Sequence, residues 1–173
     1  MFKNSLRLIT FLIFSLFTSS DTTKNNNGIS GLINLPNANF SEEGNASMII
    51  FRGEPDRKYT FTFSPFDWME GGFYYSDITG KEYGNGYLQS YKDKGFNVKF
   101  KLKDQDKYPA IALGFNDFAG TGIYSSEYLV SSYSLNNMNI TLGLGWGNLA
   151  GSATFTNPFS QLSDNFLERQ TSY

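Results

Sequence analysis

The sequence predicts an all-β protein, an antiparallel meander of about seven amphipathic strands. The clearest observation is MNITLGLGW at residues 138–146, where every second residue from Met138 to Trp146 is apolar and the residues between are small or polar. A period of two places one apolar and one small or polar face on an extended strand. The composition agrees: 40% hydrophobic and 17% aromatic residues, with 17 glycines and only 5 prolines, is typical of strands joined by turns.

The first strands are predicted from alternating segments on either side of turns. Residues 46–52 (ASMIIFR) are mostly apolar, and in residues 58–63 aromatic residues alternate with lysine and threonine. The sequence Gly-Glu-Pro-Asp at residues 53–56 has strong turn chemistry, so these two strands are predicted to form a hairpin. A third strand is predicted at residues 68–77, after a turn at residues 64–67.

The second half of the chain continues the pattern. In residues 96–102, phenylalanine, valine and leucine alternate with asparagine and lysine, and a charged turn at residues 103–107 leads to a strand at residues 110–115 (AIALGF). The last hairpin is predicted to join residues 126–134 to residues 138–146. The Leu-Asn-Asn sequence between them fits because asparagine adopts the positive φ of such turns.

The remaining segments are predicted to have other roles. Residues 21–28 are polar and are expected to be a disordered lead-in. Residues 29–39 form a short apolar run with one proline, which predicts either a first strand or a plug-like segment. Residues 78–93 are polar and predict a long loop, and residues 158–169 predict a short helix.

The N-terminus has the pattern of a secretory signal peptide. Lys3 and Arg7 supply the positive start, residues 8–17 the apolar core, and small residues precede an expected cleavage at Asp21. The core is well short of the about 20 residues that a spanning helix needs, although an uncleaved N-terminal anchor stays an alternative. The signal peptide predicts an exported chain.

We therefore expect a signal peptide at residues 1–20, a polar lead-in with a short segment leading into the barrel at residues 21–45, and a β-barrel portion at residues 46–173. Exported amphipathic strands with aromatic ends are typical of an outer-membrane β-barrel. A soluble periplasmic β-sandwich that binds carbohydrate is the alternative, because it half-buries its strands in the same way. Single-chain bacterial barrels have an even number of strands, so seven strands indicate an incomplete barrel and a piece of a longer protein.

Charge and composition exclude several functions. The net charge of −2 falls by two, to −4, without Lys3 and Arg7, and no basic patch indicates nucleic-acid binding. The chain contains no cysteine and no histidine, which excludes thiol catalysis, Ser–His triads and most transition-metal sites. We expect no cofactor and no metal. An exported chain without disulfides is typical of bacterial envelope proteins.

Several segments resemble the YjbH-type family of exopolysaccharide and capsule biosynthesis proteins. The matching sequences are GFNDFAGTGIYSSEYLVSSY and ITLGLGWGNLAG within residues 114–151, ISGLINLPNA at residues 29–38, and the segments at residues 64–78 and 90–102. Members are several times longer, so the chain resembles an N-terminal portion. The family is often lipid-anchored, and this chain, without cysteine, departs from that pattern.

The resemblance implies a component of exopolysaccharide or capsule biosynthesis or export in the bacterial outer membrane. Its expected partners are outer-membrane lipid, polysaccharide and other envelope biosynthesis proteins, and no enzymatic activity is expected. The aromatic residues at positions 73–75 and Tyr83, Tyr87 and Tyr91 fit membrane-interface girdles better than sugar-stacking platforms.

Three residues are candidate polysaccharide contacts: Asp117, Phe118 and Glu127. In the loop that holds the first two, Asp117 would accept hydroxyl hydrogen bonds and Phe118 would stack on a sugar. The structural interpretation is favoured, because these are standard turn residues: Gly120 and Gly122 would adopt positive φ and Asp117 would bind nearby amides.

Glu127 begins a strand and is predicted to face the barrel interior, where Lys99 or Lys101 would pair with it. Paired carboxylates would also suit a glycosidase. The carboxylates considered for such a pair are Asp67, Glu70, Asp117 and Glu127. Nothing in their spacing fixes the separation of about 5–10 Å that this chemistry needs, so the enzymatic interpretation is not favoured.

Overall fold

The fold is all-β, as predicted. The computed structural model describes residues 22–84, 86, 88–136, 138–150 and 156–167; the predicted signal peptide lies outside them. The elements are β1 (Gly31–Leu32), β2 (Leu35–Pro36), β3 (Ala46–Arg52), β4 (Asp56–Phe66), β5 (Met69–Glu82), β6 (Ser90–Lys103), β7 (Ala110–Asn116), β8 (Ser126–Leu135), β9 (Met138–Gly147), and two 3₁₀ helices, η1 (Pro158–Gln161) and η2 (Asp164–Phe166).

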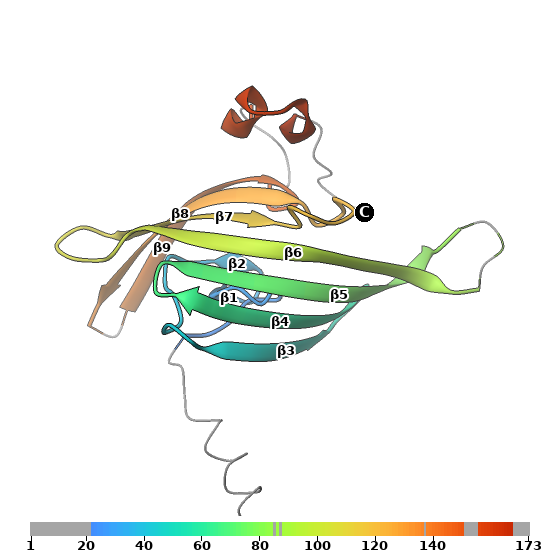
Figure 1. Ribbon diagram of the computed structural model, residues 1–173, viewed down its shortest axis with the longest axis horizontal. Helices are drawn as coiled ribbons and strands as arrows, with labels where there is room; N and C mark the ends of the chain where they lie inside the picture. The colour runs from blue at the N-terminus through green and yellow to red at the C-terminus, as the bar shows by residue number, and fades with distance from the viewer. Residues whose placement is uncertain (1–21, 85, 87, 137, 151–155, 168–173) are drawn as a thin grey trace, which may run out of the picture.

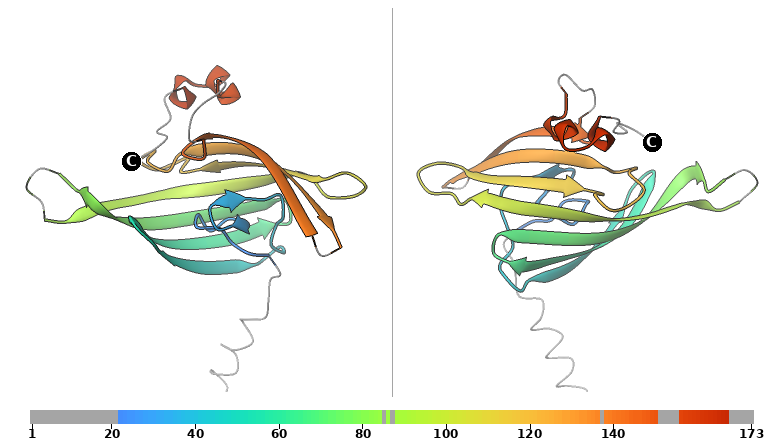
Figure 2. Two further views of the ribbon diagram at one scale, coloured as in Figure 1. Left: turned by 180° about the vertical axis from the view of Figure 1, so that it is seen from behind. Right: turned by 45° about the horizontal axis from the view of Figure 1, so that its top comes forward.

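Seven of the strands form one antiparallel meander in the order β3-β4-β5-β6-β7-β8-β9. Every strand pairs with its neighbour in the chain, which confirms the predicted topology. The sheet is strongly curved, and the small β1–β2 sheet lies inside the curve (Figures 1 and 2). Within the described residues β3 and β9 do not pair with each other, so the sheet is open.

The two faces of the sheet have the reverse of the usual polarity. We call the concave face, which the N-terminal segment covers, the inner face, and the opposite one the outer face. Buried residues of the inner face are mostly polar, among them Lys58, Thr60, Thr62, Glu70, Ser76, Asp93, Asn97 and Lys99. Exposed residues of the outer face are mostly apolar or aromatic, among them Met48, Ile50, Tyr59, Phe61, Phe63, Phe73, Tyr75, Phe96, Ile140, Leu142 and Leu144.

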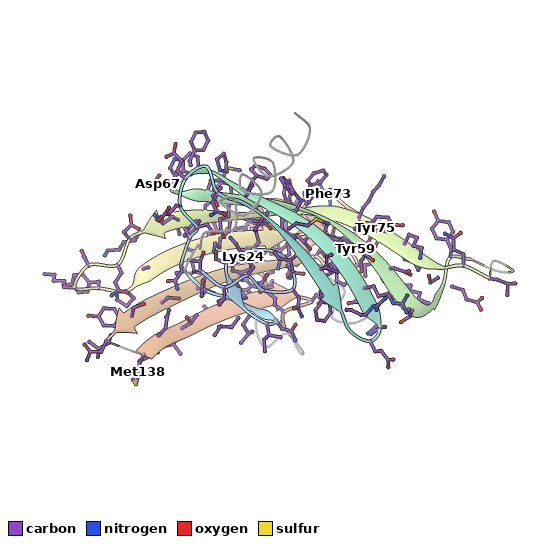
Figure 3. All side chains as sticks on the ribbon, turned by 90° about the horizontal axis from the view of Figure 1, so that it is seen from below. Lys24, Tyr59, Asp67, Phe73, Tyr75 and Met138 are labelled. Carbon is purple, nitrogen blue, oxygen red and sulfur yellow. The ribbon has the colours of Figure 1, made fainter. Side chains whose placement is uncertain are left out.

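This polarity contradicts the β-sandwich alternative. A sandwich packs the apolar faces of its strands into a common core. Here Leu142 and Met48, which lie on the two edge strands β9 and β3, are 74% and 67% exposed, while Lys99 is fully buried. Figure 3 shows Phe73 projecting from the outer side of the sheet and Lys24 among the residues that the sheet encloses. The alternation was predicted correctly, and the structure adds that the polar side is the covered one.

Residues 22–41 form a folded segment against the inner face, and we call them the plug. Thr62 Oγ1 donates to the carbonyl oxygen of Gly28 at 2.5 Å, and Asn97 Nδ2 to that of Asn27 at 2.8 Å. The expected disordered lead-in at residues 21–28 is therefore wrong for the described residues 22–28, because polar side chains of the sheet bind their backbone. The plug-like interpretation of residues 29–39 agrees with the position of β1 and β2.

Two strand boundaries differ from the prediction. The expected turn at residues 64–67 is wrong, because residues 64–66 belong to β4, which continues past an irregular register to pair Phe66 with Met69. The expected long loop at residues 78–93 is also wrong, because Ile78 pairs with Tyr91 and Glu82 with Ser90. Beyond Ile78, where β4 no longer pairs with β5, strands β5 and β6 project past their neighbours (Figure 1), and residues 79–82 carry no apolar alternation.

The C-terminal end of the described chain covers part of the outer face. Of the helix expected at residues 158–169, residues 158–167 are described, and they contain two short 3₁₀ helices. The Phe159 ring packs edge-on against Trp146, with centroids 6.3 Å apart, and against Phe115 at 5.1 Å. Trp146, the aromatic residue at the end of the alternating segment, is therefore buried. In the last hairpin Asn136 adopts the expected positive φ of 53°.

The close packing of the inner face gives a first prediction. A Cβ at Gly114 would overlap the ring of Tyr128, which is 1% exposed, so this buried ring would have to shift, whereas a Cβ at Gly72 would meet its nearest atoms at 3.6 Å. Gly114→Ala should therefore lower the free energy of unfolding by about 1–3 kcal/mol, and Gly72→Ala should change it little. Denaturant titration of both variants of the full-length protein checks this; equal stabilities would contradict the packing.

Candidate functional site

A buried ion pair lies at the centre of the inner face. Glu70 on β5 and Lys99 on β6 are direct cross-strand partners, and their side chains are fully buried. Lys99 Nζ lies 2.9 Å from Glu70 Oε2. A charge removed from water is costly unless it is paired and fully hydrogen-bonded. The further contacts of both side chains show how this condition is met.

Glu70 binds the plug at three places. Lys24 Nζ lies 2.6 Å from Glu70 Oε1. The backbone amides of Ser30 and Ser41 each donate to the Glu70 carboxylate at 3.0 Å, and the Ser30 hydroxyl donates to Oε1 at 2.5 Å. One carboxylate of the sheet thus fixes both ends and the middle of the plug.

Lys99 binds the same segment through backbone oxygens. Its ammonium donates to the carbonyl oxygens of Ser30, Asn37 and Asn39 at 3.3, 3.4 and 2.6 Å. The same nitrogen lies 4.3 Å from the centroid of the Phe40 ring, within cation–π range. We call Glu70 and Lys99, with these plug contacts, the clamp. Its chemistry is that of a structural lock, since every charged group in it is engaged by the protein itself.

A second polar cluster lies near the end of the inner face where β3 joins β4. Lys58 Nζ donates to Asn27 Oδ1 at 3.1 Å and lies 3.7 Å from the centroid of the Tyr124 ring. The Tyr124 hydroxyl donates to Asp56 Oδ1 at 2.8 Å and shares a 2.9 Å hydrogen bond with Ser76 Oγ. The cluster lies under the loop at residues 117–125, which supplies Tyr124.

A cavity of about 330 Å³ adjoins this cluster. Amide, carboxylate, ammonium and aromatic groups line it: Asn26, Asn27, Asn34, Phe51, Glu54, Pro55, Asp56, Lys58, Tyr124 and Asn148. Such groups suit hydrogen bonding and stacking with a polyhydroxylated ligand. Among the described residues no group of three or more histidine, cysteine, aspartate or glutamate side chains is placed to hold a metal ion.

Asp117 is a turn residue of the inner side. Its φ is 50°, it is 3% exposed, and its Oδ2 accepts hydrogen bonds from the amides of Gly122 and Tyr124 at 2.9 and 3.2 Å. Burial raises the pKa of the Asp117 carboxyl, against the lowering effect of these bonds. Gly122 has the expected positive φ of 88°, but Gly120 does not; Gly120 is needed because a Cβ there would overlap Asp117 Oδ1. This geometry fits the structural interpretation of the loop.

The other two candidate residues lie apart from Asp117. Phe118 is 56% exposed, and its ring centroid lies 6.4 Å from that of Phe96 on the outer face. Glu127 does not face the interior as expected, because its cross-strand partners Phe115 and Trp146 lie on the outer face. It is buried beneath the C-terminal segment, where Asn157 Nδ2 donates to its Oε2 at 2.8 Å.

The lysines expected beside Glu127 have other partners. Lys99 pairs with Glu70, and Lys101 Nζ lies 3.0 Å from Asp104 Oδ1. Asp117 and Glu127 face opposite sides of the sheet, so the structure does not bring them together as a glycosidase pair. Glu70 and Lys99 were both named from the sequence but were not paired with each other, so the clamp was missed. The pattern that could have indicated the clamp is a charged residue at an inner position on each of two adjacent strands.

Comparison with known proteins identifies the family. The family model for YjbH, described as exopolysaccharide biosynthesis protein YbjH, matches residues 23–173. The chain belongs to the YjbH exopolysaccharide biosynthesis family. It is similar to the uncharacterized lipoprotein YjbH of Escherichia coli (strain K12), with 34% identity over 148 residues. The aligned region is 83% of this chain and 21% of that relative, so the chain spans about a fifth of the relative's length.

The match confirms the resemblance that the sequence motifs indicated. No solved structure matches the chain. In the described part of the chain, no helix has the length and apolar character needed to cross a membrane.

Proposed function

We propose that this YjbH-family chain forms part of the wall of an outer-membrane β-barrel that takes part in exopolysaccharide or capsule production or export without catalysing a reaction. The single observation that carries the proposal is the polarity of the sheet: its inner face is mostly polar and covered by the plug, and its outer face is mostly apolar and exposed. Membrane barrels have a polar interior and an apolar, lipid-facing exterior.

The outer face supports a lipid contact by its extent and by its strand lengths. Large apolar residues are exposed on every strand from β3 to β9 except β7, whose outer residues are partly buried. Soluble monomers rarely expose apolar patches of more than a few hundred Å². The strands β4, β8 and β9 have 11, 10 and 10 residues, and a tilted membrane strand needs about 9–11.

The connections at the two ends of the sheet also support a barrel. One end has the turns at residues 67–68 and 136–137 and the connection at residues 104–109. The opposite end has the short turn at residues 53–55 and the two longest loops, at residues 83–89 and 117–125. Short periplasmic turns and longer extracellular loops are typical of outer-membrane barrels. In this orientation the chain enters β3 from the periplasmic end.

The polysaccharide role rests on the family match. The cavity beside Lys58 and Tyr124 offers groups suited to sugar hydroxyls, and the exposed Phe118 ring suits stacking at the rim. Asp117 and Glu127 keep structural roles in this proposal, since the protein engages both carboxylates. Outer-membrane lipid, the polysaccharide and other envelope biosynthesis proteins are the proposed partners.

Cell fractionation with heat-modifiable gel mobility tests the proposal on the full-length protein. It should appear in the outer-membrane fraction, and unheated samples should migrate differently from boiled ones. Spin labels at Ile140 or Leu144 should be quenched by lipid-soluble reagents, and a label at Asn139 on the inner face should not be. Recovery of a soluble periplasmic monomer without detergent would overturn the proposal.

A further inference from the structure

One row of charged residues crosses the outer face of four adjacent strands. Its members are consecutive cross-strand partners: Arg52 on β3 pairs with Arg57 on β4. Arg57 pairs in turn with Asp77 on β5, and Asp77 pairs with Lys92 on β6. The row lies at the end of the sheet that carries the two longest loops. Lys92 Nζ lies 2.7 Å from Asp77 Oδ2, which leaves two guanidinium groups in excess.

The next rows along the same strands change from charged to aromatic and apolar. The row directly beneath is Ile50, Tyr59, Tyr75 and Lys94, and the one after it is Met48, Phe61, Phe73 and Phe96. Figure 3 labels Tyr59, Tyr75 and Phe73 in this region. Tyrosines between charged residues and an apolar band are typical of the level of lipid headgroups. The charged row therefore lies where headgroup phosphates would be.

Arg52 and Arg57 form no close ion pair within the described chain, although Arg57 lies across from Asp77, which is already paired with Lys92. Like charges directly opposite each other on a sheet are destabilising. Both side chains are exposed, and no ion pair joins either of them to a carboxylate among the described residues. An open cavity of about 560 Å³ adjoins them, lined by Arg52, Gly53, Glu54, Arg57 and Thr79. Two adjacent guanidinium groups match the oxygens of a phosphate, which each can bind in bidentate fashion.

We infer that Arg52 and Arg57 form a binding site for the phosphate of an anionic membrane lipid. This inference rests on the proposed function, because it places the adjoining aromatic rows in the bilayer. The phosphate bridges the two guanidinium groups and removes their repulsion. The site fixes the height of the barrel in the membrane and sets the end with the longest loops against a leaflet rich in lipid phosphate.

Binding of fluorescent lipid A to the detergent-purified full-length protein tests the site, since lipid A carries phosphates on an acylated sugar. The double variant Arg52→Gln, Arg57→Gln should weaken binding by about tenfold or more, because it removes charge-assisted bonds to the phosphate. The matched control is Lys103→Gln, Lys107→Gln, which removes two charges at the opposite end and should leave binding unchanged. Dephosphorylated lipid A should bind the unaltered protein as weakly as lipid A binds the arginine variant.

Three results would overturn the inference: unchanged binding in the arginine variant, equal binding of dephosphorylated lipid A, or displacement by inorganic phosphate at concentrations comparable with those of the lipid. The arginine variant is also tested for heat-modifiable mobility and for recovery in the outer-membrane fraction. These measurements distinguish failure of the lipid-phosphate site from failure of the proposed membrane barrel. If the variant assembles and still binds, the site is wrong and the barrel stands. If the unaltered protein is not in the membrane, the proposed function itself is wrong.

Discussion

Leu142→Arg should largely abolish assembly of the protein into membranes, whereas Thr141→Arg should leave most of it intact. Leu142 lies on the outer face and is 74% exposed. A mid-membrane arginine on the lipid side costs about 2–4 kcal/mol. Thr141 belongs to the inner face, where it shares a 2.8 Å hydrogen bond with Ser132 and borders a cavity of about 540 Å³. An arginine side chain at this position would have room in the cavity and access to water.

The measurement is the fraction of each variant that is recovered from outer membranes with heat-modifiable mobility. Thr141→Lys and Thr141→Gln separate the effect of charge from that of bulk at the inner position, and Leu142→Gln does the same at the outer one. Equal tolerance of the two arginines would contradict a membrane wall. The reverse order would do so more strongly, because it would place Thr141 rather than Leu142 against lipid.

The sequence predicted the strands best where one face of the sheet is packed. The strand at residues 46–52 has the predicted bounds of β3, and the last hairpin has its turn at Asn136 as expected. In both places the residues alternate because the inner and outer faces of the sheet have different environments. The projecting parts of β5 and β6 were missed because residues 79–82 are polar or glycine and show no apolar alternation. Turn residues such as Pro65 misled the prediction where β4 continues through an irregular register.

The clamp was beyond sequence reasoning for a different reason. Alternation assigns Glu70 and Lys99 to the polar side of their strands, but their pairing depends on the register between β5 and β6, which the pattern leaves open. Lys24 and Ser30 reach Glu70 from 46 and 40 residues away in the chain. Only the folded position of the plug brings them together. Glu127 was assigned to the interior for the same reason. The sequence of its own strand gives no sign that a distant C-terminal segment covers it on the outer face.

The clamp explains how a polar interior remains ordered. An apolar core stabilises a packed segment through the area it buries, whereas this inner face holds the plug through directed hydrogen bonds, most of all those to the Glu70 carboxylate and the Lys99 ammonium. Such an arrangement is stable only when nearly all of its polar groups are satisfied. Small changes in charge at this point should therefore release a whole segment and leave the sheet in place.

Glu70→Gln should destabilise the protein by about 3–5 kcal/mol and release the plug, because it leaves the buried ammonium groups of Lys24 and Lys99 without their charged partner. The double variant Glu70→Gln, Lys99→Met should recover part of the loss by removing one of those charges. Asp104→Asn is the matched control, since this exposed carboxylate pairs with Lys101 just beyond the end of β6 and surface pairs contribute little. Denaturant titration measures the stability, and trypsin cleavage after Lys24 measures plug release. Wild-type stability with Lys24 still protected in Glu70→Gln would show that the clamp does not hold the plug.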